Sequence, residues 1–219
     1  MSRNKILSQD AYSYILDLIL TKQLLPGARV PEIKIAESLQ ISRTPVREAL
    51  QQLSNEGIIE IKANHFVQVT NFTPSMIREI GTLRLTLDTA STKLALLYGS
   101  HIDFLNLKDL AQKSIDAFYS GDNDLRRKLD CDFHLELSRI SNNDLLFKFQ
   151  SELYLRVQFI LVYHNSKVRS SIDHIRQHLE FTEALIERDE DKALSILKKH
   201  LIDYYDLINY YPSTFLSNF

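Results

Sequence analysis

Four polar residues in the second half of the chain could together bind a metal ion. Asp130 and His134 are four positions apart, so on a helix both side chains project from the same face. His178 and His200 follow in the last two segments with helical periodicity, and adjacent antiparallel helices could bring them to the same level. One carboxylate and three imidazoles form a donor set that suits zinc, nickel or a similar divalent ion.

Spacing alone leaves other interpretations of these residues open. His174 is four positions before His178 and could replace one of the ligands. An isolated Asp/His pair is also often only a hydrogen bond in a core or on a surface. Asp132 and Glu136 lie close in sequence to the first pair, but they project from other faces of the same helix.

A second set of polar residues, near the N-terminus, could read nucleic acid. Arg43 and Arg47 lie four apart on one helix face, and Thr44 beside them can donate a hydrogen bond. A guanidinium can bond to both acceptors of a guanine edge or hold a phosphate, and a helix N-terminus also favours phosphate. In the competing interpretation, both arginines are ordinary solvated residues that pair with Glu48 or Glu56.

Composition limits the classes of protein that need to be considered. A net charge of −2 argues against a uniformly basic nucleic-acid coat protein, although it permits one basic face. The single cysteine, Cys131, excludes an intramolecular disulfide and a thiolate-rich zinc site. The sequence has no run of about 18 apolar residues, and its start lacks the apolar core and cleavage site of a signal peptide. We therefore expect a cytoplasmic protein without a membrane segment.

The elements of the first third are typical of a winged helix-turn-helix. Apolar periodicity predicts helices over 9–21, from Pro31 to Leu39, and over 43–55, with Ser42 as the N-cap of the third. Two β-rich runs, 58–61 and 66–69, then form a short hairpin. Two close helices followed by a hairpin are the order of elements in a winged helix-turn-helix.

The remainder of the chain predicts only helices, beginning with Thr73 as N-cap and Pro74 as the first helical residue. We expect helices over 74–98, 102–119, 122–141, 144–164, 170–188 and 190–211. Because their apolar residues recur at intervals of three and four, these helices must pack on one another as an antiparallel bundle. The predicted fold class is mainly α, with a winged helix-turn-helix in residues 1–72 and an all-α antiparallel helical bundle in residues 73–219.

The first domain resembles a known family of regulators. The stretch S-R-T-P-V-R-E-A-L at 42–50, with A-E-S-L at 36–39 and E-G-I-I at 56–59, is similar to the DNA-binding domain of the bacterial GntR family. The resemblance covers residues 8–70 and implies that Arg43, Thr44 and Arg47 contact DNA. It also implies that His65, at the tip of the wing, enters the minor groove. The wing departs from the family pattern, because its turn contains no glycine.

The second domain resembles the metal-binding branch of GntR regulators with an FCD (FadR C-terminal domain) effector domain. The stretch D-C-D-F-H at 130–134, followed by histidines at 178 and 200, carries this resemblance. It implies that Asp130, His134, His178 and His200 hold a divalent metal, with zinc or nickel expected. It also implies that Arg84 faces the effector cavity, with Asp88 where relatives often have Glu. A cation beside a metal suits a small organic acid as effector.

We therefore expect a ligand-responsive bacterial DNA-binding transcriptional regulator, without catalytic residues, that binds double-stranded operator DNA. A homodimer is expected because two recognition helices must reach half-sites in successive major grooves. The alternatives are a metal-dependent hydrolase, which no obvious general base supports, and a regulator whose metal is purely structural. The tyrosines at 204, 205, 210 and 211 could line a pocket, but bundle packing or a dimer surface suits them better.

Overall fold

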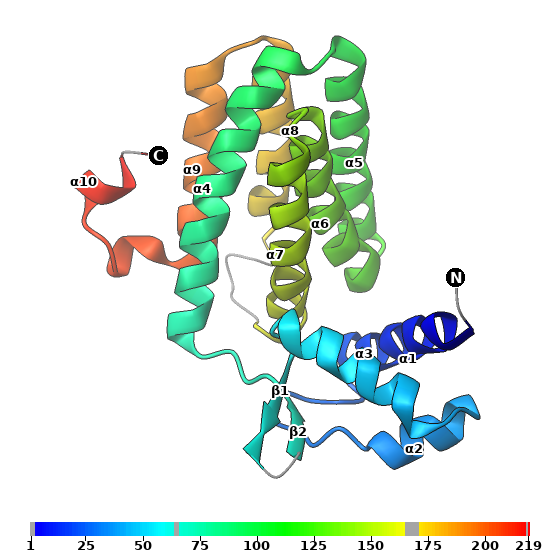
Figure 1. The fold of residues 1–219 in the computed structure, drawn as a ribbon. Helices are drawn as coiled ribbons and strands as arrows, with labels where there is room; N and C mark the ends of the chain where they lie inside the picture. The colour runs from blue at the N-terminus through cyan, green and yellow to red at the C-terminus, as the bar shows by residue number, and fades with distance from the viewer. Residues whose placement is uncertain (1–2, 64–65, 165–170, 218) are drawn as a thin grey trace. The chain divides into compact units, whose positions relative to one another are not determined.

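The structure, a computed structural model, describes residues 3–63, 66–164, 171–217 and 219. The chain divides into two compact units, Met1–Thr73 (unit 1) and Pro74–Phe219 (unit 2). Unit 1 has the helices and hairpin of a winged helix-turn-helix, and unit 2 is a helical bundle (Figure 1). The mainly α fold class expected from the sequence is confirmed.

Unit 1 packs three helices beside a two-stranded wing. Its elements are α1 (Arg3–Leu20), α2 (Glu32–Leu39), α3 (Arg43–Asn55), β1 (Ile59–Lys62) and β2 (Phe66–Val69). The helix α3 packs on α1, and its apolar face, which includes Val46 and Leu50, is buried. The strands are antiparallel, with Ile59 opposite Val69, and Arg29 forms an isolated bridge to Gln68. This packing leaves the opposite face of α3 in solvent.

The first helix begins at Arg3, so the prediction that it starts near Gln9 is wrong. The amide of Asn4 donates to both carboxylate oxygens of Glu48 on α3, at 2.9 and 3.0 Å. This contact between distant parts of the sequence supports the extra N-terminal turns. The helix ends at Leu20, shortly before Lys22 adopts a left-handed conformation.

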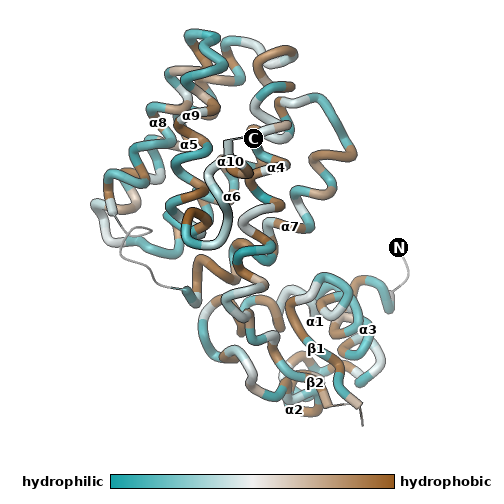
Figure 2. Tube along the Cα trace, turned by 90° about the vertical axis from the view of Figure 1, so that its left-hand side faces the viewer, coloured by the Kyte–Doolittle hydropathy of each residue, from teal (hydrophilic) through white to brown (hydrophobic). Residues whose placement is uncertain are grey.

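Unit 2 is built from long amphipathic helices. They are α4 (Pro74–Tyr98), α5 (His101–Tyr119), α6 (Asn123–Ile140), α7 (Asp144–Tyr163), α8 (Ile172–Ile186) and α9 (Glu190–Tyr205). Hydrophobic and hydrophilic stretches alternate along them in Figure 2, and the buried positions include Phe104, Phe133 and Phe159. The helix α5 packs against α6 and α8, while α4 packs against α9 and α6. Within the described residues, no helix combines the length and apolarity that crossing a membrane requires.

The last long helix ends at Tyr205, which corrects the predicted helix over 190–211. Asp206 has a φ of 56°, and this left-handed conformation stops the helix. The chain continues through the short 3-10 helix η2 (Leu207–Asn209) and α10 (Ser213–Leu216). The start of the first helix of unit 2 follows the expectation, because α4 begins at Pro74.

Polar contacts surround the junction between α4 and α5. Ser100 and Asp103 form a reciprocal capping box at the start of α5. Arg188, between α8 and α9, donates to the backbone oxygens of Leu96 and Gly99 at 2.6 and 2.7 Å. The guanidinium thereby satisfies carbonyl groups that the end of a helix leaves without partners. The turn between α8 and α9 is consequently tied to the end of α4.

Candidate metal centre and nucleic-acid interface

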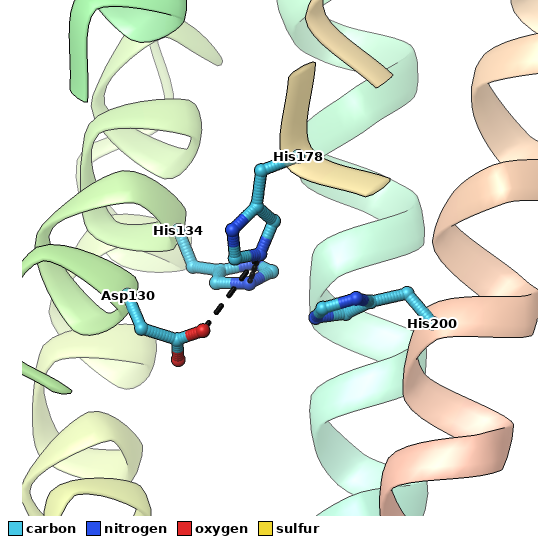
Figure 3. Close-up of side chains that lie close together, drawn as sticks. All are labelled: Asp130, His134, His178 and His200. Carbon is cyan, nitrogen blue, oxygen red and sulfur yellow. Dashed lines mark hydrogen bonds and ion pairs between the residues drawn. The ribbon is translucent and has the colours of Figure 1, made fainter. Parts of the chain in front are cut away.

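The four predicted ligands lie together in the core of unit 2. Asp130 and His134 come from α6, His178 from α8 and His200 from α9. Each offers one ligand atom, and these atoms all lie within 4.8 Å of one another. All four residues are buried, and Figure 3 shows the carboxylate and the three rings turned toward one another. Helical spacing on α6 and packing of α8 against α9 therefore produce one compact donor set.

The distances within this donor set fit a shared divalent ion. The Nε2 atoms of His134 and His178 are 3.2 Å apart. Two nitrogens that bind one tetrahedral zinc ion at about 2.0–2.1 Å are about 3.4 Å from each other. Nε2 of His178 lies 3.8 Å from Oδ1 of Asp130. The second oxygen, Oδ2 of Asp130, is buried without a hydrogen-bond partner in the described part of the chain, so it too could accept a cation.

The protonation states also suit metal binding. Burial lowers the pKa of His178 to about 3, although Asp130 partly opposes this shift. Burial holds the pKa of His200 well below its ordinary value, and the neighbouring histidines add to the effect. For Asp130 burial acts to raise the pKa, but His178 and Arg84 outweigh it and keep the pKa below its usual value. Metal ligands must be neutral imidazoles and ionised carboxylates, which is the state favoured here.

The alternative ligand His174 does not belong to this group. Its ring stacks on that of His200, with centroids 3.9 Å apart and planes only 11° from parallel. A lone pair of imidazole nitrogen lies in the plane of its ring, so two stacked rings direct their lone pairs side by side. Such rings do not converge on one ion, and His174 is better described as a packing partner of His200.

Arg84 lies beside the donor set and is fully buried on α4. Its Nε donates to the hydroxyl of Tyr154 at 2.8 Å and to Oδ2 of Asp88 at 3.4 Å. Nη1 donates to the hydroxyl of Tyr205 at 3.4 Å, and Nη2 lies 3.9 Å from Oδ2 of Asp130. The guanidinium is thus an interior cation between two carboxylates.

Asp88 connects this guanidinium to the donor set. Its carboxylate is fully buried, accepts a hydrogen bond from Gln150 at 2.5 Å, and lies 3.1 Å from Nδ1 of His134. Burial acts to raise the pKa of Asp88, but His134 and Arg84 outweigh it and hold the pKa below its usual value. Sequence reasoning did not single out Gln150 or Tyr154. Their spacing of four, like that of Arg84 and Asp88, was the available signal.

The tyrosines near the end of α9 do not act as one set. Tyr204 and Tyr205 are buried, whereas Tyr210 is 52% exposed. Gly81 on α4 allows Tyr205 to approach closely, because a Cβ at Gly81 would lie 2.4 Å from Cγ of Tyr205. The missing side chain thereby lets the Tyr205 hydroxyl reach Arg84.

In unit 1, the predicted DNA-contacting residues of α3 lie at its N-terminal end. Arg43, Thr44 and Arg47 are all exposed on the first two turns. Ser42 occupies the N-cap position, but its side chain makes no capping hydrogen bond. The amides of Arg43 and Thr44 are therefore available to a phosphate oxygen, whereas Pro45 has no N–H to offer.

Glu32 on α2 is the carboxylate that pairs with both arginines. Its Oε2 lies 3.8 Å from Nη2 of Arg43 and 3.2 Å from Nε of Arg47. The competing sequence interpretation named Glu48 and Glu56 as partners, but these two accept hydrogen bonds from side chains of α1. Both guanidinium groups are exposed to solvent, which weakens such pairs even though Glu32 is only 17% exposed, so a phosphate or a base edge could displace Glu32. The prediction for His65 falls outside the described residues.

Two family models match the chain in succession. Residues 7–67 match the model described as "Bacterial regulatory proteins, gntR family", and residues 79–203 match the FCD domain. The Nta operon transcriptional regulator of Aminobacter aminovorans is 29% identical over 185 residues, which cover 84% of this chain and 85% of that protein. The Uxu operon regulator of Haemophilus influenzae is 28% identical over 193 residues, which cover 80% of this chain and 71% of that protein.

Solved structures share the fold at lower identity. Escherichia coli McbR/YncC superposes with a TM-score of 0.75 at 22% identity, covering 93% of this chain and 97% of that one. A putative GntR regulator from Rhodococcus sp. RHA1 superposes with a TM-score of 0.78, also at 22% identity. The match covers 93% of this chain and 98% of that one. At such identities the likeness supports the fold alone.

The winged helix-turn-helix, the helical second unit and the regulators that the chain resembles together define a transcriptional regulator rather than an enzyme. The chain belongs to the bacterial gntR family, among the members that carry an FCD domain. The alternative of a metal-dependent hydrolase is therefore set aside.

The buried histidines predict that the metal-free protein loses stability on mild acidification. The pKa of His178 is about 3 in the folded protein and about 6.5 in an unfolded chain, and that of His200 is likewise depressed. Below pH 6.5 the unfolded state therefore binds protons that the native state excludes. Stability should fall by up to about 1.4 kcal/mol per pH unit for each histidine.

Urea unfolding of chelator-treated protein at pH 7.5, 6 and 5 measures this effect. This pH range stays above the region near pH 4, where protonation of Asp88 and Asp130 would also change the stability. His178→Asn should give a shallower slope, whereas His101→Asn, at an exposed position, should not. A stability that stays level or rises toward pH 5 would contradict the burial of neutral histidines.

Proposed function

We propose that residues 1–72 bind double-stranded operator DNA through Arg43, Thr44 and Arg47, with His65 contributing at the wing tip. The exposed position of the first three residues on α3 supports this role. The free amides of the same helix end offer phosphate ligands that would set the register of α3 in the major groove. The arginine side chains would leave Glu32 to reach base edges or phosphates.

We also propose that the regulator acts as a homodimer. Two copies of α3 are needed to read half-sites one helical turn apart. Unit 2 carries large apolar side chains in solvent, including Leu83 on α4 (48% exposed) and Leu145 and Phe149 on α7 (68% and 57%). Leu145 and Phe149 are four apart and share one face of α7, as an association surface requires.

The donor set in unit 2 is proposed to hold one divalent metal, zinc or nickel. This proposal is supported by four buried ligand atoms that lie within 4.8 Å of one another, contributed by Asp130, His134, His178 and His200. When bound, such an ion would supply positive charge, and expansion beyond four ligands would let it accept one further donor. It would join α6, α8 and α9 at one level of the bundle.

The charge balance around Arg84 favours a small organic acid as effector. One guanidinium and the carboxylates of Asp88 and Asp130 leave a net charge of −1 in the core when the imidazoles are neutral. A divalent ion changes this to +1, and a monocarboxylate beside the metal returns it to zero. Nη2 of Arg84 lacks a hydrogen-bond partner among the described residues and is the donor that the acid would engage.

Binding of the acid is proposed to change the DNA-binding state through α4. This helix carries both Arg84 and Asp88 and begins at Pro74, directly after unit 1. An effector that prefers one placement of α4 would shift the population of regulator between DNA-binding states.

The DNA proposal predicts that Arg43→Ala and Arg47→Ala each weaken binding by roughly 5- to 150-fold, equivalent to about 1–3 kcal/mol. The duplex would be chosen by selection from a random library with the wild-type protein, and affinity measured by fluorescence anisotropy at constant salt. Lys5→Ala removes the same charge from an exposed position on α1 and should change affinity little. Stoichiometry in the same titration should be two chains per duplex. Equal affinities for all variants would exclude α3 as the recognition helix.

The metal proposal predicts about one zinc or nickel ion per chain in protein purified without chelator. Elemental analysis should find this ion lost in His134→Ala and His178→Ala, because three donors remain where four are needed. His174→Ala is the matched control, since it removes a neighbouring buried imidazole that stacks on His200. A wild-type protein that stays metal-free after incubation with zinc, or loss of metal only in His174→Ala, would refute the assignment.

The effector proposal predicts that some small carboxylic acid raises the melting temperature of the metal-loaded protein, whereas its uncharged amide does not. At 100 times Kd the stabilisation is about 2.7 kcal/mol. Arg84→Lys keeps the charge but loses the planar fork, so it should reduce the response. If no acid has an effect, the metal has only a structural role. An undiminished response in Arg84→Lys would remove Arg84 from the site.

A further inference from the structure

Asp88 contacts a histidine of the donor set in addition to its partners around Arg84. Its carboxylate is fully buried and already accepts hydrogen bonds from Gln150, Tyr154 and Arg84. In addition, its Oδ2 lies 3.1 Å from Nδ1 of His134, whose ring is also fully buried. Asp88 itself is not among the four residues whose ligand atoms converge.

This contact determines which nitrogen of His134 is free to bind. The contact lacks the alignment of a hydrogen bond, but a lone pair on Nδ1 would face an ionised carboxylate, so the charge of Asp88 favours the tautomer with the proton on Nδ1. The other nitrogen, Nε2, is then unprotonated and points toward the donor set, 3.2 Å from Nε2 of His178. The carboxylate therefore favours this tautomer and this orientation of the ring.

We propose that Asp88 is a positioning residue for the metal, which tightens binding by orienting the His134 ring and favouring the tautomer whose Nε2 is free to bind. The inference rests on the metal centre proposed above. A carboxylate behind a ligating histidine usually strengthens metal affinity 10- to 100-fold.

The other two histidines lack this kind of support. Nδ1 of His200 lies 3.0 Å from Oε1 of Gln177, which is a neutral and partly exposed acceptor. Nδ1 of His178, like that of His134, has no aligned hydrogen-bond partner among the residues that the structure describes, but the carboxylate contact of His178 is made through Nε2, to Asp130. Within that part of the chain, His134 is thus the one imidazole of the donor set whose second nitrogen faces a carboxylate. Removal of the carboxylate behind His134 should therefore weaken metal binding most.

Zinc affinity of the full-length Asp88→Asn protein, measured by competition with a chromophoric chelator, tests this role. We expect binding about 10- to 100-fold weaker than in the wild type, because the amide keeps the shape and loses the charge. Gln150→Met is the control, since it removes a buried hydrogen bond to the other oxygen of Asp88 and leaves the His134 contact intact. It should lower the melting temperature of the metal-free protein while changing zinc affinity less than Asp88→Asn does. Equal zinc affinity for wild type and Asp88→Asn would overturn the proposal.

A second measurement needs no variant and covers the case in which Asp88→Asn fails to fold. In zinc-loaded wild-type protein with ¹⁵N-labelled histidine, long-range proton–nitrogen correlations should place the His134 proton on Nδ1 and zinc on Nε2. A proton on Nε2, or zinc on Nδ1, would contradict the positioning role. If the wild type binds no zinc at all, the metal centre itself is wrong, and the role of Asp88 falls with it.

Discussion

The buried positive charge of Arg84 is the constraint on which unit 2 depends. A guanidinium without solvent needs nearby negative charge and hydrogen-bond acceptors, because leaving it unpaired costs several kcal/mol. The acceptors come from four helices: Asp88 on α4, Asp130 on α6, Tyr154 on α7 and Tyr205 on α9. Satisfying one cation therefore fixes the relative level of most of the bundle, and Gly81 provides the space that lets Tyr205 take part.

The donor set is assembled around the same charges. Asp130 faces Arg84 through one oxygen and His178 through the other, and Asp88 lies between Arg84 and His134. Two carboxylates exceed the single guanidinium by one negative charge, and the adjacent imidazoles are kept neutral by burial at His178 and His200. A buried site of this composition attracts a cation first and then an anion. The proposed sequence of metal and organic acid follows from that order of charge.

The proposed communication with DNA has a simple covalent basis. The helix α4 starts immediately after unit 1 and carries Arg84 and Asp88 two to four turns further along. A helix transmits displacement along its length as a rigid element, so an event at these side chains bears on the segment that precedes Pro74. Membership of the gntR family with an FCD domain is consistent with this arrangement, because it joins a DNA-reading unit to a sensing unit in one chain.

The sequence by itself determined helix α3, the proposed recognition helix, and the helical bundle, because both depend on local patterns. Arg43, Thr44 and Arg47 lie within one turn or so of each other, and apolar residues at intervals of three and four specify amphipathic helices whatever their partners. Spacing also placed Asp130 and His134 on one face of α6. Only the tertiary structure separated His174 from the donor set, paired both arginines of α3 with Glu32, brought Asp88 to His134 and ended α9 at Tyr205. These features depend on ring orientation, on contacts between distant segments and on one left-handed residue, and none of them leaves a periodic signal in the sequence.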